Sequence, residues 1–493
     1  MTGSADSLAP ARPPAARVAR NTALRAAAEI LGKLATLALT SIMVVQLGID
    51  AAGQFGFALA ISQLYWPLAG FGLDRLMLRE IAVDPRQTAV LVPQLNGFKL
   101  AAGLLCVVVG TLFVAISQGW GTVAAITLIL GLSLVATLIG STAQNVFMAR
   151  ERMEDYFVAA LPVKLFGAVL GIAVLLIGGG LVAVGLANLI AACAGIGLGW
   201  WLLSTRYDQP PAGLAGTPRT WSPLLRRSGP WGVQEVFGQI TLRFGIIVLF
   251  LSAGDTIAGE YRSAYQLLEA TLFLPWSIAS SVLPLIARAA GDRASGDEPP
   301  LEVITRSAIE LVCSLMLPIS VLLALCAEPI LRTLYTSQAL PAAGYLPLLA
   351  AAAVIYGAGH IAGIVALSHL PGRRTVETMA ITSAISVALV LLLVPAYGGR
   401  GAAIAALATE TVLTVLSLRL AMQVTSAKIL LSMVSTSTVA ALAMAAVVLP
   451  LRDHLVAAVI AGGCVYALIL LGLEYRRRGA TWALMRSIVP GLR

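Results

Sequence analysis

The sequence predicts an all-α polytopic membrane protein with about 14 transmembrane helices, arranged as two parallel six-helix bundles plus two C-terminal helices. Three observations predict this fold. Hydrophobic residues make up 58% of the 493 residues and charged residues only 12%, whereas about a quarter of the residues of a soluble protein are charged. Apolar windows long enough to cross a bilayer recur along the whole chain. Residues of the first half also recur in the second half at a constant offset.

The elements follow in order along the chain. Residues 1–20 are rich in Pro, Ala and Arg without an apolar stretch, which predicts a disordered cytoplasmic tail rather than a signal peptide. We expect residues 21–204 to form the N-terminal bundle, 229–424 the C-terminal bundle and 425–475 the two extra helices. The Pro-, Gly- and Arg-rich residues 205–228 are the expected linker, and residues 476–493 a basic cytoplasmic tail. Apolar windows start near residues 22, 53, 90, 120, 156, 181, 229, 264, 305, 344, 375, 401, 428 and 454.

The positions of the 33 Lys and Arg residues predict the orientation. Most of them flank the spans on one side, and loops rich in Lys and Arg face the cytoplasm, so both termini are expected there and the number of spans is even. The expected location is a bacterial cytoplasmic (inner) membrane. The basic residues of the outward connections are Arg262, Arg332, Arg400 and Arg452, and those within spans are Lys33, Lys99, Lys164 and Arg243.

The internal repeat appears when the chain is shifted by 206 residues. The shift relates spans one and two to spans seven and eight and preserves their direction through the membrane. Parallel repeats of this kind are typical of transporters. The paired residues are Glu29 with Glu235, Gly32 with Gly238, Gly48 with Gly254, Ala52 with Ala258, Gly53 with Gly259 and Ala58 with Ala264.

The seventh span, Pro230–Leu251, has one polar face, because Glu235, Gln239 and Arg243 follow at every fourth position. Arg243 is expected near mid-membrane, where a charge costs about 3 kcal/mol. It either lines a wet cavity or pairs with a glutamate inside the bundle. In span one, Lys33 lies four residues after Glu29, and either pairs with that acid or faces the same cavity as Arg243.

The candidate substrate-binding residues are Arg243, Lys33, Gln239 and Glu269; the last is the repeat equivalent of Gln63. The candidate ion-coupling residues are Glu29 and Glu235, because a buried carboxyl group can exchange a proton. We interpret Lys99 and Lys164 as side chains that extend back to the interface, and Glu410 as a helix contact. The five cysteines lie in apolar runs without metal-ligand spacing, so we expect no metal site and no cofactor.

Three segments of the chain resemble the polysaccharide-export branch, or O-antigen flippases, of the multidrug/oligosaccharidyl-lipid/polysaccharide (MOP) flippase superfamily. Leu47–Ala82, LGIDAAGQFGFALAISQLYWPLAGFGLDRLMLREIA, resembles the region from the first to the third span in that family. AGEYRSAYQLLEATLFLPWSIASSVLPLIAR, Ala258–Arg288, is similar to its eighth span, and VPAYGGRGAAIAALATE, Val394–Glu410, to the turn into its twelfth span.

The resemblance implies a flippase for an undecaprenyl-diphosphate-linked oligosaccharide in exopolysaccharide or O-antigen biosynthesis. It implies alternating access through a cavity lined by spans one, two, seven and eight, with H+ or Na+ as coupling ion. The family often has an acid two positions after the span-seven arginine, but here Phe244 and Gly245 follow Arg243. The expected partners are the lipid-linked oligosaccharide and membrane lipids, with no nucleic acid. We expect a monomer, and leave polymerase or glycosyltransferase partners open.

An enzyme and a different transporter are the two alternatives to this function. A glycan polymerase or ligase is the enzyme alternative, but the outward connections are short and contain no Asp-x-Asp pair for a metal-bound sugar nucleotide. We therefore expect a transporter and not an enzyme. A lipid II flippase or a multidrug exporter of the same superfamily is the transporter alternative. Lys33 and Arg243 argue against export of cationic drugs, whereas lipid II carries the same diphosphate as the expected substrate.

Overall fold

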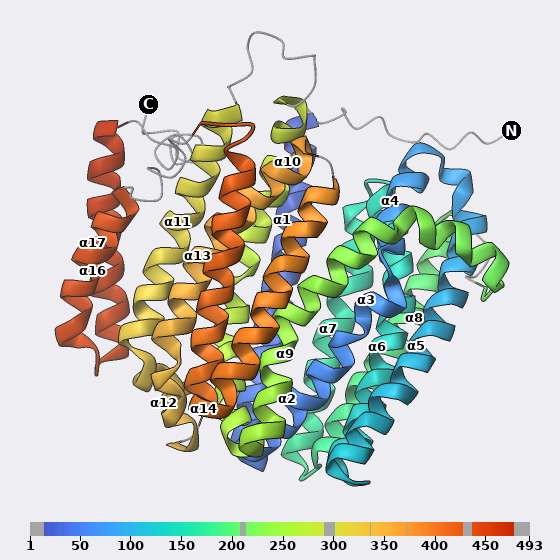
Figure 1. Ribbon diagram of the computed structural model, residues 1–493, viewed down its shortest axis with the longest axis horizontal. Coiled ribbons are helices and arrows are strands. Elements are labelled where there is room, and N and C mark those ends of the chain that lie inside the picture. The colour runs from blue at the N-terminus through green and yellow to red at the C-terminus, as the bar shows by residue number, and fades with distance from the viewer. Residues whose placement is uncertain are drawn as a thin grey trace, which may run out of the picture.

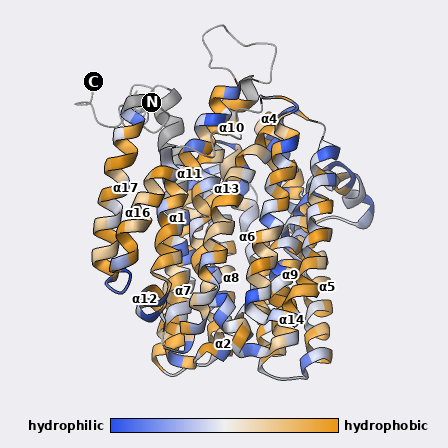
Figure 2. Ribbon diagram, turned by 60° about the vertical axis from the view of Figure 1, so that its left-hand side comes forward, coloured by the Kyte–Doolittle hydropathy of each residue, from blue (hydrophilic) through white to orange (hydrophobic). Residues whose placement is uncertain are grey.

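A computed structural model describes residues 14–207, 213–289, 301–335, 337–370, 372–426 and 436–477 of the chain. Within these residues the regular structure is helical, without strands, which confirms the predicted all-α fold. Most of the length of the helices is hydrophobic, as Figure 2 shows by colour. Large apolar side chains such as Leu105, Val109 and Ile116 are exposed along one helix, as expected for a surface that contacts lipid.

The first half of the chain forms eight α-helices and one 3-10 helix. They are α1 (Pro14–Leu47), α2 (Ile49–Leu64), α3 (Trp66–Gly70), α4 (Leu73–Val83), η1 (Pro85–Gln87), α5 (Thr88–Gln118), α6 (Thr122–Ala149), α7 (Met153–Leu176) and α8 (Leu181–Tyr207). Helix α1 begins before residue 22, where the first span was expected. Residues 1–13 of the expected tail and residues 208–212 of the expected linker lie outside the described residues.

The second half begins with the longest helix, α9 (Pro218–Thr271). It continues with α10 (Phe273–Ala289), α11 (Leu301–Leu325), α12 (Ala327–Leu334), η2 (Ser337–Gly344), α13 (Leu346–His369), α14 (Gly372–Ala421), α16 (Thr436–Leu451) and α17 (Leu455–Arg477). Residues 478–493, most of the expected basic tail, lie outside the described residues. Domain boundaries remain predictions from the sequence.

Ten of the described helices are long and apolar enough to cross a membrane. Two of them, α9 and α14, are divided into two arms by non-helical glycines, Gly254 and Gly398, so each supplies two of the expected spans. The two other expected spans correspond to α2 and α16, which are 16 residues long each. Each expected span therefore has a helix or an arm of a helix as its counterpart in the described chain.

The helices form two groups that meet along α2 and α9 (Figure 1). Helices α5 to α8 pack together on the side of α2, and α11, α13 and α14 pack together on the side of α9. Helices α16 and α17 lie at the far edge against α11, where the Tyr466 hydroxyl donates a 2.7 Å hydrogen bond to the carbonyl of Ser314. In Figure 1, α4 and the end of α10 lie at the top, hereafter the terminal side, and η2 lies near the bottom, the opposite side.

The repeat is visible in the backbone. Gly48, between α1 and α2, has φ 87° and ψ 173°, and Gly254, between the two arms of α9, has φ 86° and ψ 178°. Glycine adopts such positive φ angles readily, whereas residues with a Cβ rarely do. The two residues are related by the offset of 206 found in the sequence, so the repeat-related helices begin with the same change of direction.

The two halves cross closely at another pair of repeat-related glycines. A Cβ added to Gly53 of α2 would lie 1.9 Å from the carbonyl oxygen of Asp255, and one added to Gly259 of α9 would lie 2.1 Å from that of Ile49. Backbone therefore meets backbone on the opposite side of the molecule. Two hydrogen bonds surround the crossing, from Thr256 Oγ1 to Asp50 and from Gln54 Nε2 to Asp255.

Candidate substrate site

A buried cluster of charges lies between the halves, on α9. Arg243, on the first arm, places Nη1 2.7 Å from Oε1 of Glu269 on the second arm. Arg262, also on the second arm, places Nη1 2.9 Å from Oε2 of the same glutamate. The side chains of Arg243, Glu269 and Arg262 are only 14%, 15% and 7% exposed, respectively. Each carboxylate oxygen thus accepts from a different guanidinium in a nearly dry environment, where removal of one partner is costly.

The positions along α9 explain this geometry. Arg262 and Glu269 are seven residues apart, two helical turns, and therefore lie on one face. Room for the Arg262 side chain comes from α2, because a Cβ on Gly56 would lie 3.0 Å from its Cγ. Gly56 is the repeat equivalent of Arg262. The sequence predicts Arg262 in an outward connection; this prediction is wrong, because the side chain is buried in the cluster.

The cluster carries an excess of positive charge. Two arginines against one glutamate leave one positive charge, and Lys33 of α1 lies near enough to Glu269 to act on it electrostatically. The expected partner of Lys33, Glu29, instead accepts a 2.7 Å hydrogen bond from Lys164 Nζ on α7. Among the described residues, no hydrogen bond or ion pair involves the Lys33 ammonium group. Lys33 is therefore available to a ligand.

Glu235 lies away from this cluster although it is on the same polar face as Arg243. Its Oε1 lies 3.2 Å from Nε of Arg75 on α4, in the other half. A second ion pair joins Arg227 of α9 to Glu80 of α4. Between the two, a Cβ on Gly72 would lie 2.6 Å from the backbone nitrogen of Gly232. These contacts hold α4 against α9 on the terminal side, as the Gly53–Gly259 crossing holds α2 against α9 on the opposite side.

Helix α4 is itself held within the first half by Lys99 of α5. The Lys99 side chain is fully buried, and its Nζ donates to Asp74 Oδ1 at 2.6 Å, to Thr142 Oγ1 at 2.9 Å and to the carbonyl of Leu138 at 3.0 Å. All three donors of the ammonium group are used. The interpretation of Lys99 as a side chain extending to the interface was therefore wrong; it is an internal crosslink between α4, α5 and α6.

A small cavity of about 260 Å³ adjoins the cluster. Gln63, Arg243 and Arg262 supply its polar lining, together with the rings of Tyr261 and Tyr265. The remaining predicted residue, Gln239, precedes Arg243 by one turn of α9. The structure thus brings Arg243, Glu269 and Lys33 together, with Gln239 adjacent, whereas Glu29 and Glu235 are engaged in ion pairs elsewhere.

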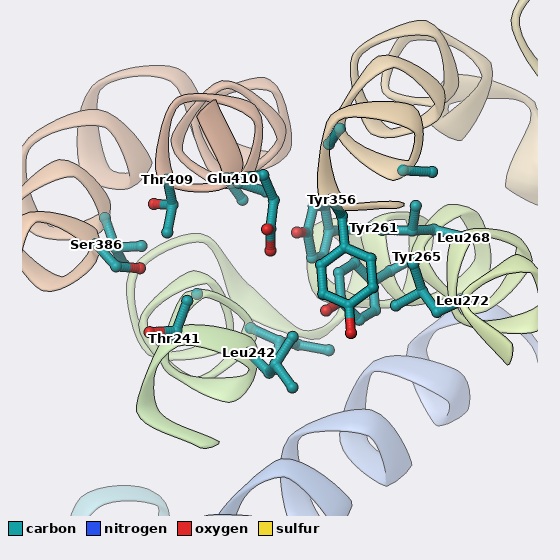
Figure 3. A pocket seen from close by; sticks show the side chains of 17 residues that line it. Thr241, Leu242, Tyr261, Tyr265, Leu268, Leu272, Tyr356, Ser386, Thr409 and Glu410 are labelled. Atoms are coloured by element: carbon teal, nitrogen blue, oxygen red, sulfur yellow. The ribbon is translucent and has the colours of Figure 1, made fainter. Parts of the chain in front are cut away.

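A larger cavity of about 580 Å³ lies within the second half, between α9, α13 and α14. Figure 3 shows the Glu410 side chain pointing into it, opposite Thr241, with Tyr356 and Ser386 at its sides. Glu410 Oε2 is buried and has no hydrogen-bond partner among the described residues. The sequence predicts Glu410 to be a helix contact, because nothing in the pattern of its own helix indicates the cavity that α9, α13 and α14 form together.

Comparison with known proteins gives a family match and several matches of fold. Residues 18–290, more than half of the chain, match the model of a family described as polysaccharide biosynthesis protein. This range contains Arg243, Glu269, Arg262, Lys33 and Gln239. No curated protein sequence matches the chain significantly.

Several solved structures share the fold. The lipid II flippase MurJ in an inward closed conformation aligns with a TM-score of 0.71 at 14% identity, covering 93% of this chain and 99% of that one. An inward-facing multidrug resistance MATE family transporter of the MOP superfamily aligns with a TM-score of 0.60 at 17% identity, covering 83% and 98%. A MOP superfamily transporter from Pyrococcus furiosus aligns at 0.59 and 14%, covering 82% and 95%.

Proposed function

The chain belongs to the polysaccharide biosynthesis protein family, and on this premise we propose that it is a flippase for an undecaprenyl-diphosphate-linked oligosaccharide. It carries this lipid from the inner to the outer leaflet of a bacterial cytoplasmic membrane by alternating access. The terminal side, with its basic flanks, faces the cytoplasm. The fold and family are those of transporters, and the activity proposed is transport without a chemical step.

The buried cluster at Arg243 carries the proposal. A diphosphate is a compact anion that forms charge-assisted hydrogen bonds with guanidinium and ammonium groups. Arg243, Arg262 and Lys33 supply three positive charges against the single carboxylate of Glu269. Glu269 pairs with the guanidinium of Arg243 in this structure, and in the proposed mechanism the diphosphate takes its place when the lipid enters. The low dielectric of the site strengthens both interactions.

The helix contacts on the two sides of the cluster define how such a site is reached from one leaflet at a time. We call the contacts between α4 and α9 the cytoplasmic closure, and the crossing of α2 and α9 at Gly53 and Gly259 the outer closure. The cytoplasmic closure consists of one glycine contact and two ion pairs, Arg75–Glu235 and Arg227–Glu80, whose side chains are partly exposed. Partly exposed pairs each contribute only about 0–1 kcal/mol. The outer closure brings two helix backbones into contact at Gly53 and Gly259. The cytoplasmic side therefore opens more easily from this state and admits substrate from the inner leaflet.

Ion coupling is assigned to Glu410 rather than to Glu29 or Glu235. The latter two carboxylates are neutralised by Lys164 and Arg75. Glu410 points into a cavity of the second half, and among the described residues no cation pairs with it. A carboxylate so placed can bind H+ or Na+ from the cavity, whose lining also includes the hydroxyl groups of Thr241 and Ser386.

Two alternatives differ in the substrate. The excess of positive charge in the cluster disfavours a cationic drug, the expected cargo of a multidrug exporter. Lipid II also carries a diphosphate, and the fold resembles that of a lipid II flippase.

A glycan polymerase or ligase would require a catalytic group that acts on the sugar, and the charged side chains of the cluster fit phosphate binding instead.

Vesicles containing the purified protein test the proposal directly. Undecaprenyl diphosphate bearing a short glycan is placed in both leaflets, and its access to a membrane-impermeant glycosidase is followed over time. We expect the inaccessible fraction to become accessible only when protein is present. Parallel vesicles with lipid II identify the substrate class. Failure to move either lipid, under an H+ or a Na+ gradient, would refute the flippase proposal.

A further inference from the structure

Two glutamines near the cluster have side-chain oxygens without a hydrogen-bond partner among the described residues. Gln63 lies on α2 and Gln239 on the first arm of α9. The side-chain oxygens of both are shielded from solvent, and no group in the described part of the chain donates a hydrogen bond to them. Shielded acceptors normally have a donor, because leaving one unsatisfied costs free energy. Neither amide is needed to join the helices.

Both amides are next to the proposed phosphate ligand. Gln63 lines the 260 Å³ cavity together with Arg243. Gln239 precedes Arg243 by four residues, so the two side chains project from the same face of α9. A ligand whose diphosphate contacts Arg243 therefore has its neighbouring group within reach of the two glutamines.

The repeat relates these positions to the charges of the cluster. The offset of 206 pairs Lys33 with Gln239 and Gln63 with Glu269. Each half thus contributes one charged side chain and one neutral amide at equivalent places. The excess positive charge of the cluster and the neutral amides near it have different chemistry, which suits a ligand with an anionic part and an adjacent neutral polar part.

A carboxamide offers N–H donors and a C=O acceptor, and a hydroxyl group both donates and accepts. In a lipid-linked glycan, the neutral polar group adjacent to the diphosphate is the first sugar. We propose that Gln63 and Gln239 form a subsite that binds the hydroxyl groups of the sugar attached directly to the diphosphate. This subsite rests on the proposed function, and makes the first sugar a determinant of substrate specificity.

Binding to the full-length protein in nanodiscs tests the subsite. The probes are undecaprenyl diphosphate without sugar and the same lipid bearing one glucose, galactose or N-acetylglucosamine. Two hydrogen bonds of ordinary net strength correspond to about tenfold in affinity. We expect the wild-type protein to bind at least one of the three glycolipids about tenfold more tightly than the sugar-free lipid.

The double variant Gln63→Met, Gln239→Met keeps the side-chain length and removes the hydrogen bonds. We expect it to bind the glycolipid and the sugar-free lipid equally well, at the wild-type affinity for the latter. Asn96→Leu is the matched control, because the buried Asn96 amide on α5 also lacks a partner in the described part of the chain and lines neither cavity. That variant should keep the preference for the sugar. If the double Met variant does not fold, the single variants Gln63→Asn and Gln239→Asn, which shorten the reach, should each weaken the preference.

The outcomes separate the subsite from the function on which it rests. A wild-type protein that binds all four lipids equally, or Met variants that keep the sugar preference, would overturn the subsite. Variants that lose affinity for the sugar-free lipid to the same extent would assign the glutamines a structural role, which also overturns it. If the wild-type protein binds no diphosphate lipid, and Arg243→Ala changes nothing, the proposed function itself is wrong.

Discussion

Glu235 forms its ion pair with Arg75 of the other half, 3.2 Å away, and not with Arg243, which lies two turns further along its own helix. The partner of Arg243 is Glu269, at 2.7 Å. Glu235 and Arg243 lie on one polar face in the sequence, but their different partners give them different roles. In the proposed mechanism, Glu235 helps to close the cytoplasmic side, and Arg243 belongs to the proposed substrate site.

The first prediction concerns Arg243. Arg243→Ala should lower the affinity for the diphosphate lipid by about 10–100-fold, because it removes a charge-assisted hydrogen bond. Arg243→Lys should retain part of the affinity, since it keeps the charge but loses the planar fork. Flipping in vesicles and binding in nanodiscs measure both, and the amount of folded protein should not change, because Arg262 still pairs with Glu269.

The decisive control for this prediction pairs Arg243→Ala with Glu269→Gln. The double variant removes the arginine together with the charge that it neutralises. If Arg243 binds phosphate, flipping stays low in the double variant. Recovery of wild-type flipping would mean that the arginine only neutralises Glu269, and the phosphate-binding role would be abandoned.

The second prediction concerns the cytoplasmic closure. Glu235→Gln breaks the pair with Arg75 and should favour opening toward the cytoplasm. A single cysteine introduced at Leu59, beside the small cavity, should then react faster with a thiol reagent applied from the cytoplasmic side. The charge exchange Arg75→Glu with Glu235→Arg should restore the slower reaction. Glu377→Gln is the control, because its pair with Arg373 lies within one helix and is largely exposed. Equal reaction rates in all four proteins would contradict the role of this pair.

The third prediction concerns the outer closure. Gly259→Ala places a Cβ 2.1 Å from a backbone oxygen, which the closed state cannot accommodate. We expect this variant to remain folded and to lose most of its flipping activity. The cysteine introduced at Leu59 should react in it with thiol reagents applied from the outer side. Gly463→Ala on α17 is the control, since a Cβ there meets nothing within 4 Å. Normal flipping by Gly259→Ala would show that transport does not need this crossing.

The fourth prediction concerns Glu410. Glu410→Gln keeps the shape of the side chain and removes the charge that binds a cation. We expect flipping by this variant to become independent of an H+ or Na+ gradient, while binding of the diphosphate lipid is unchanged. Measuring flipping with and without each gradient checks it. A variant that still responds to the gradient like the wild type would place the coupling ion elsewhere.

The sequence predicts the parts of this architecture that depend on local pattern. Apolar length gives the spans, and the 206-residue offset pairs Gly48 with Gly254, whose backbone angles match within a few degrees. It also places Arg243 and Glu269 as site candidates. Ion-pair partners are not predictable in this way. Lys164 reaches Glu29 from a helix far along the chain, so spacing within one helix gave the wrong alternative for Glu29.

The surroundings of Arg262 and Glu410 also depend on the packing of helices and cannot be predicted from local pattern. Arg262 lies just after the turn at Gly254, so hydropathy places it outside the membrane, whereas the crossing of α2 and α9 buries it. Glu410 is an isolated acid in an apolar helix, and only the packing of three helices forms a cavity beside it. The domain boundaries, the coupling ion and the monomeric state remain predictions.

The hydrogen bonds of the Lys99 ammonium group determine which parts of the molecule can serve as a frame of reference for motion. Helix α4 cannot shift relative to α5 without breaking the hydrogen bond from this fully buried ammonium group to Asp74, and α6 cannot shift relative to α5 without breaking the other two. During transport, spectroscopic labels on α4 and α6 should therefore keep a constant separation. Labels on α4 and the first arm of α9 should change theirs, because the cytoplasmic opening is then a displacement of the second half away from a rigid first half.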